Sequence, residues 1–188
     1  MSEPEKKVEI EGAGEISTEN KEVAMLIAVL ALLLAITELL GSAAQVKSVQ
    51  ANIEASNLWS FYQAKAIRST TLETAVEQIE ADMPSVTGKQ KETREELVKK
   101  WKGTIARYES DPKTKEGREE IKERAKEAEH ERDTAEGKHQ KYELAVGAFH
   151  IAIVLASAAI ITGMPALIWG SGLLGFFGLL NLLGGYIG

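Results

Sequence analysis

The chain has 188 residues, with 22 basic and 28 acidic side chains and a formal net charge of −6. It has no cysteine, which excludes disulfides, thiolate nucleophiles and cysteine metal sites. Basic and acidic residues are intermixed and form no basic face, so we expect no nucleic acid partner.

The chain starts with an acidic tail, residues 1–22, and continues with an apolar run over residues 23–44. A transmembrane helix needs about 20 apolar residues, and this run predicts transmembrane helix 1. A signal peptide is the alternative, but the long acidic region before the run and the lack of a clear cleavage site argue against it.

The charged segment 45–143 predicts a helical stalk made of three helices. Residues 45–82 contain neither proline nor glycine and should prolong the first helix. Helices over 89–109 and 112–143 follow, the last with Asp111 as its N-cap and Pro112 at its first position. At 1.5 Å per residue the first arm rises about 60 Å and the last descends about 46 Å. Helix 89–109, about 30 Å long, should therefore lie obliquely at the tip as a cap.

The last stalk helix shows a heptad pattern that continues into the next apolar run. Positions four and three residues apart form a seam typical of a coiled coil, and its small alanines would let a partner helix approach closely. Chance heptads in a charged helix are the alternative. The seam consists of Ile121, Ala125, Ala128, Arg132, Ala135, His139, Tyr142, Val146, Phe149 and Ile153.

Two further apolar runs, 144–163 and 166–187, predict transmembrane helices 2 and 3, separated by a break at Met164 and Pro165. An interfacial hairpin is the alternative, although neither run has the charged face that such a helix needs. Small and polar residues of the third span should mediate close helix packing and self-association. These residues are Ser171, Gly175, Asn181, Gly184 and Gly188.

Two ionisable residues fall inside the predicted spans, Glu38 and His150. Each lies about six residues below the same membrane face, so we expect them to pair. The pair is either a proton or ion relay or a contact that fixes helix packing, and Glu38 alone could also extend to the headgroups.

The stretch 55–70 concentrates aromatic and basic side chains on a helix. Trp59, Tyr62 and Gln63 should share one face, while Phe61, Lys65 and Arg68 should lie on another, which requires two neighbours. Helix rise places Trp59 level with residues 129–132 of the descending helix. The second neighbour is expected to be the same helix of an adjacent subunit, and a ligand site is the alternative.

Two Glu-x-x-His elements, ending at His130 and His139, lie nine residues apart on one helix and face opposite sides, so we expect no metal site. No phosphate loop, nucleophile elbow or triad pattern occurs in the sequence. We expect neither an enzyme nor a cofactor.

Residues 20–45 and 54–68 together resemble a bacterial family known as domain of unknown function 4337. The resemblance rests on an apolar span followed by a W-x-F-Y-Q-A-K-x-I-R-type motif, here Trp59 to Arg68. It implies a bacterial inner membrane protein and brings no assigned activity.

The sequence therefore predicts an all-α membrane protein with three transmembrane helices and a long antiparallel coiled-coil-like helical stalk between spans 1 and 2. The basic residues that flank the stalk favour a cytoplasmic stalk, although Lys21 argues for the opposite orientation. We expect a homo-oligomer in the lipid bilayer with a structural or channel-like role. A membrane-anchored adaptor that recruits a protein partner at the stalk tip is the alternative.

Overall fold

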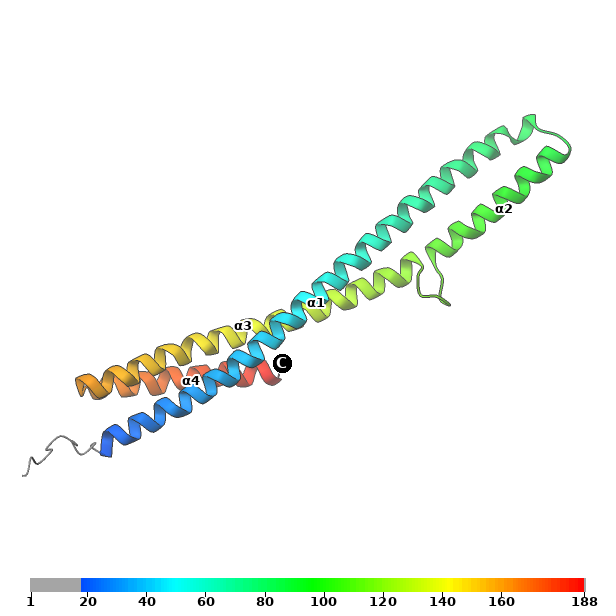
Figure 1. Ribbon diagram of the computed structural model, residues 1–188. Coiled ribbons are helices and arrows are strands. Elements are labelled where there is room, and N and C mark those ends of the chain that lie inside the picture. Colours follow the sequence, from blue (N-terminus) through cyan, green and yellow to red (C-terminus); the bar gives the residue numbers. More distant parts are fainter. Residues whose placement is uncertain (1–17, 188) are drawn as a thin grey trace, which may run out of the picture. The chain divides into compact units, whose positions relative to one another are not determined.

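The computed structural model describes residues 18–187, and all long secondary-structure elements within these residues are helices (Figure 1). Gly188 and most of the predicted acidic tail lie outside the described residues. The elements are α1 (Thr18–Asp82), the 3₁₀ turn η1 (Met83–Ser85), α2 (Lys89–Glu109), α3 (Arg118–Thr162) and α4 (Pro165–Ile187). The all-α prediction is confirmed.

Three of the four long helices are long and apolar enough to cross a membrane. Their most apolar windows reach mean hydropathies of 2.7 in α1, 2.4 in α3 and 1.8 in α4. A positive φ of 63° at Gly163 ends α3, and Pro165 then opens α4 at a position where a missing N–H costs nothing. The expectation of three apolar helices is confirmed at this level.

The chain divides into two compact units. We call residues 18–42 and 138–187 the apolar unit, and residues 43–137 the charged unit. Helices α1 and α3 each contribute one part to each unit, whereas α2 belongs to the charged unit and α4 to the apolar unit.

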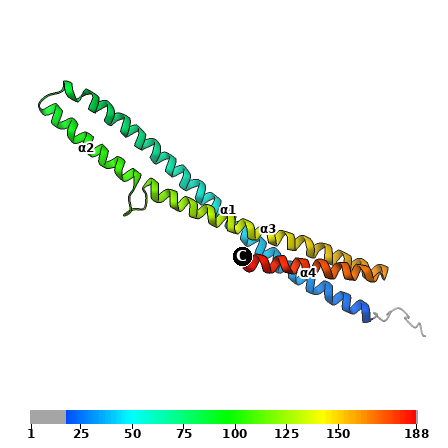
Figure 2. The ribbon, with the colours of Figure 1, turned by 180° about the vertical axis from the view of Figure 1, so that it is seen from behind.

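In the charged unit, α2 and then α3 lie alongside α1 and run in the opposite direction (Figures 1 and 2). Lys102 of α2 binds Glu80 of α1 at 2.6 Å, and Glu129 of α3 accepts a hydrogen bond from Trp59 of α1 at 2.9 Å. As residue numbers fall along α1 they rise along its partners, so the pairing is antiparallel.

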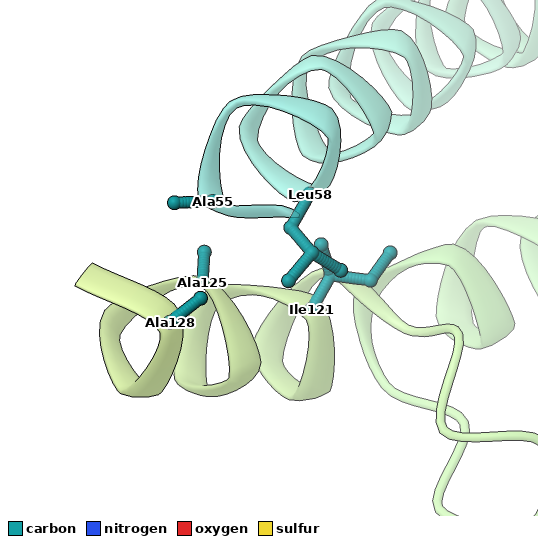
Figure 3. Packing of buried hydrophobic residues seen from close by; sticks show 5 residues of the cluster. All are labelled: Ala55, Leu58, Ile121, Ala125 and Ala128. Carbon is teal, nitrogen blue, oxygen red and sulfur yellow. The ribbon is translucent and has the colours of Figure 1, made fainter. Parts of the chain in front are cut away.

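Small apolar side chains form the core of the charged unit. Ala55 and Leu58 of α1 face Ile121, Ala125 and Ala128 of α3, and all five are buried (Figure 3). Ile121 and Ala125 have no exposed surface at all. Alanines on both helices bring the two backbones close together, and Trp59 and Tyr62 cover the edge of the cluster.

Two details of the predicted stalk are wrong. Helix α3 begins at Arg118, not near Pro112, because residues 110–117 form a loop that contains one turn, closed by the Lys115 N–H on the Asp111 carbonyl at 2.9 Å. Moreover, α2 is no oblique cap. Because α3 starts six residues later than predicted, its part of this unit is shorter. Together, α2 and this part of α3 match the length of the about 40 residues, or about 60 Å, that α1 contributes to the unit.

In the apolar unit, α4 packs against both α1 and α3 through its glycines. A Cβ on Gly175 would lie 2.8 Å from Leu30 of α1, and one on Gly178 would lie 2.8 Å from the ring of Phe149 on α3. Since Phe149 is fully buried, only glycine leaves room for its ring at this position.

Candidate functional site

The aromatic and basic motif of α1 lies where α2 gives way to α3. The Trp59 indole N–H donates to the Glu129 carboxylate, within the range of residues that helix rise predicts. The rings of Trp59 and Tyr62 meet edge to face, with centroids 5.6 Å apart and planes at 77°. This geometry suits the ring quadrupoles and fixes both side chains.

Lys65 is buried, with 6% of its surface exposed, and its ammonium group points into the loop 110–117. It donates to the backbone carbonyl of Glu116 and lies 3.8 Å from the Glu116 carboxylate. The same ammonium stands 4.9 Å from the ring centre of Phe61 and 5.7 Å from that of Tyr108. Aromatic faces and a carbonyl together replace the water that a buried ammonium loses.

The loop has its own hydrogen-bond network, centred on Glu120 in the first turn of α3. The Glu120 carboxylate accepts from the Ser110 hydroxyl at 2.7 Å and from the Asp111 N–H at 3.2 Å. The Ser110 hydrogen bond is the main reason that the pKa of Glu120 lies below its usual value. Glu at this position of a first turn is a standard helix-start feature.

Asp111 caps the single turn inside the loop, not a helix. Its carboxylate accepts from the Thr114 N–H at 3.4 Å. Loss of solvent opposes its ionisation, but hydrogen bonds from Thr114 and Lys113 and the charge of Arg107 outweigh this, so its pKa is lowered.

Arg118 joins the loop to the motif. It donates to the Tyr62 hydroxyl at 3.2 Å, stacks over the Tyr62 ring at 5.0 Å and forms an ion pair with Glu109 at 2.7 Å. The bond to Tyr62 and the charge of Glu109 raise its pKa despite its partial burial. Its Nε is buried and has no hydrogen-bond partner among the described residues.

We call this assembly the junction: Trp59, Tyr62, Lys65, the loop 110–117 and Arg118. Apart from Nε of Arg118, its cationic groups contact carbonyls, carboxylates and rings of the same chain, and these contacts hold the loop on α1. Within residues 18–187 no group of three or more His, Asp or Glu side chains gathers as a metal site would require.

The junction uses only part of the predicted motif. Tyr62 and Lys65, expected on different faces, both point toward α2 and α3, whereas Gln63 and Arg68 are exposed. Phe61 is 37% exposed beside Lys65. The expected division into two faces is therefore wrong, because Tyr62 and Lys65 lie together on the side of α1 that packs against α2 and α3.

The structure brings Glu38 and His150 together in the apolar unit. Glu38 Oε1 lies 3.9 Å from His150 Nε2, and both side chains are more than half exposed. The pair thus lies on the outer surface of the three-helix unit. The other histidine of this unit, His139, is less exposed, and its ring nitrogens Nδ1 and Nε2 lie 3.1 Å from the Gly41 carbonyl and 3.4 Å from the Glu143 carboxylate.

The small residues of α4 have different environments. Ser171 and Gly175 are buried against the chain's own helices, and within residues 18–187 the Ser171 hydroxyl has no hydrogen-bond partner. Asn181 donates to the Phe177 carbonyl of its own helix at 3.0 Å. Gly184 is half-buried near Lys141, and Gly188 lies outside the described residues.

Sequence reasoning missed half of the junction. Gly117 before α3 and Glu120 three residues later are a helix-start signal, but Asp111 and Pro112 offer a stronger one nearby. Nothing in local sequence spacing pairs Arg118 with Tyr62, because that contact depends on tertiary structure.

A sequence model of the family described as "Domain of unknown function (DUF4337)" matches residues 19–188, and the chain belongs to this family. The resemblance inferred from the span and the W-x-F-Y-Q-A-K motif is thereby confirmed. No curated protein and no solved structure matches the chain.

Proposed function

We propose that this member of the family is a homo-oligomeric, multi-pass protein of the bacterial inner membrane with a structural or channel-like role. In this proposal the apolar parts of α1, α3 and α4 are the three spans. The charged unit is the antiparallel coiled-coil-like stalk, which we place in the cytoplasm because of the basic residues that flank it.

Large apolar side chains on the outer surface of the apolar unit support a membrane location. Each of the three helices presents such side chains outward. In water this surface would favour aggregation, whereas hydrocarbon solvates it. Examples are Leu32 and Leu39 of α1, Ile151 and Val154 of α3, and Leu173 and Phe176 of α4.

The exposed Glu38–His150 pair is the main observation in support of a homo-oligomer. Ionisable groups inside a bilayer are costly unless they face protein or water. A lone subunit would turn both side chains toward lipid, since each is more than half exposed. A neighbouring subunit that covers this face would remove the pair from lipid. The pair would then contact either protein alone or the water of a channel.

The test is the native mass of the full chain in nanodiscs or mild detergent. We expect a defined multiple of the chain mass, and a monomer under all conditions would refute the proposal. Glu38→Gln should lower the oligomer fraction, while Ile36→Val, an exposed change on the other side of α1, should leave it unchanged. A conductance measurement in planar bilayers separates the channel-like role from the structural one.

The adaptor remains the second candidate, and the loop 110–117 favours it. Lys65, Glu120 and Arg118 hold this loop in one conformation, while Pro112 to Glu116 stay exposed. A rigid exposed loop is suited to recognition by another protein. If Lys113→Glu with Lys115→Glu abolished co-purification of one partner protein but left native mass unchanged, the adaptor would be favoured.

A further inference from the structure

The side of α1 that faces away from α2 and α3 in the charged unit has an unusual composition. Nine positions spaced alternately three and four residues apart form a line along it, which we call the outer strip. All nine are exposed and none is charged, in a chain with 27% charged residues. The outer strip consists of Val46, Val49, Ile53, Ser56, Ser60, Gln63, Ile67, Thr70 and Thr74.

The outward side of a water-exposed helix normally carries the charges. Helix α3 follows this rule, with Glu123, Lys126 and Glu127 exposed on its outward side. On α1, by contrast, Glu54 and Arg68 lie beside the strip, not on it, so charge is absent from the side where solvent contact would favour it.

Apolar side chains begin the outer strip, and one more lies in its second half. Val46, Val49 and Ile53 are 53%, 52% and 55% exposed, and Ile67 is 68% exposed. A shallow depression at this part of the strip is lined by Ile67, Thr70 and Thr74 together with the neighbouring Ala66, Thr71, Ala75 and Gln78. An alternating three-and-four spacing with apolar side chains is the pattern by which two helices pack.

We propose that the outer strip is the surface through which α1 packs, parallel and in register, against α1 of a second copy of this chain. The inference rests on the proposed membrane function, because copies inserted in one bilayer share one orientation. The neighbouring copies would contact each other through the strip, while the opposite side of α1 stays engaged with α2 and α3 of its own chain.

The chemistry of the strip fits a second copy better than a different partner. In a parallel, in-register pair each residue meets its own counterpart, so a charged residue would face an identical charge. Serine, threonine and glutamine can both donate and accept, so each can hydrogen-bond to itself across the contact. Valine and isoleucine likewise pack on their own counterparts. A different partner would leave no reason to exclude charges of both signs.

The size of the strip explains why the contact needs the membrane. From Val46 to Thr74 the helix rises about 42 Å, and a helix about 10 Å wide would bury about 400 Å² on each copy. Stable interfaces between free proteins bury roughly 1,200 Å² or more in total. The strip alone is therefore a weak contact, and tethering by the spans supplies the effective concentration that it lacks.

Single-cysteine cross-linking tests this surface directly, since the chain has no cysteine of its own. A disulfide needs Cα atoms about 4.4–6.8 Å apart, which an in-register pair provides. In native membranes, Ile53→Cys and Ile67→Cys should give disulfide-linked dimers. The matched neighbours Glu54→Cys and Arg68→Cys, exposed but off the strip, should give at least tenfold fewer.

Equal cross-linking on and off the strip, or none on the strip, would overturn the inference. Native mass then separates the two proposals. An oligomer without strip cross-links refutes the strip and leaves the proposed function standing, whereas a monomer refutes both.

A charge exchange provides a second test at the centre of the strip. Ser60→Glu or Ser60→Lys alone should reduce cross-linking through Cys at position 67 at least tenfold, because like charges meet. Co-expression of the two variants should restore it as mixed dimers. Failure of the mixed pair to recover would contradict in-register contact.

Discussion

Gly117 should be indispensable to the junction. It is buried, and a Cβ added to it would lie 2.6 Å from the Cα of Ser110 and would also meet the Asp111 amide and the Glu120 carboxylate. Two of these atoms belong to the backbone and cannot rotate away. In Gly117→Ala the loop 110–117 must therefore shift away from α3.

The free energy that Gly117→Ala removes from loop closure follows from the steric overlap of the added Cβ. Forcing one extra carbon into a filled site costs about 1–3 kcal/mol. With about 2 kcal/mol lost from the closed loop, its open population should rise about 30-fold, at 1.4 kcal/mol per factor of ten. Gly137→Ala is the matched control on α3, since nothing lies within 4 Å of its added Cβ. Replacement of a helical glycine of this kind by alanine should raise the free energy of unfolding by about 0.5–1 kcal/mol.

Limited trypsin digestion of the full chain in nanodiscs measures loop opening. Lys113 and Lys115 are exposed in the loop, and mass spectrometry identifies cleavage after each of them. When opening is fast, the rate of cleavage follows the open population. Gly117→Ala should be cut there about 30-fold faster than the wild type, and Gly137→Ala at the wild-type rate. Cleavage of Gly117→Ala at the wild-type rate would refute the role given to this glycine.

Three further changes probe separate parts of the molecule. Lys65→Met leaves a loop carbonyl without its donor and should favour loop opening by about 1–3 kcal/mol, while the exposed Arg68→Met should not, both measured by the same digestion. Gly178→Ala, whose Cβ would lie 2.8 Å from a buried ring, should lower the thermal stability of the solubilised protein, whereas Gly172→Ala, which meets nothing, should not. The lowered pKa of Glu120 means that its contribution to loop closure is complete above the usual value of 4.5 and is lost as pH falls through the lower folded value. Hydrogen exchange of the loop amides, corrected for intrinsic rates, should therefore accelerate at low pH in the wild type and depend less on pH in Glu120→Gln.

The apolar helices were predictable from sequence because a long uncharged run has few alternatives. The seam residues of α3 within the charged unit were predictable for a related reason. Ile121, Ala125, Ala128 and Ala135 follow a three-and-four spacing, and all four are buried. Periodicity reports which side of a helix is covered, and it does so without knowledge of the partner.

The start of α3 was not predictable because two local signals compete within eight residues. Asp111 followed by Pro112 favours a helix start in isolation. The loop wins because Lys65 of α1 binds its carbonyl and Arg118 reaches Tyr62, contacts between residues about 50 positions apart. These tertiary interactions override the local preference.

The side of α1 that packs on α2 and α3 was missed because only two large aliphatic residues, Leu58 and Val76, are buried on it, and most of its other buried positions are small or polar. Ser48, Ala51, Ala55 and Ser69 are buried on it, together with the charged Lys65. Small side chains allow close approach to the alanines of α3, so the contact is made by backbone proximity and not by large side chains. Hydrophobic periodicity in the sequence does not detect such an interface.

The two kinds of exposed apolar residue on this chain call for different partners. In the apolar unit they surround all three helices, as a fluid solvent such as lipid requires, because lipid contacts every outward direction. On α1 of the charged unit, apart from Phe61 beside Lys65, the large ones lie on one line, bordered by Glu54 and Arg68. A line of uncharged residues cannot be a lipid-facing surface, since the charged sides next to it would enter the hydrocarbon too. It matches the footprint of one helix, and its uncharged, self-complementary side chains make a second α1 the partner that the physical chemistry favours.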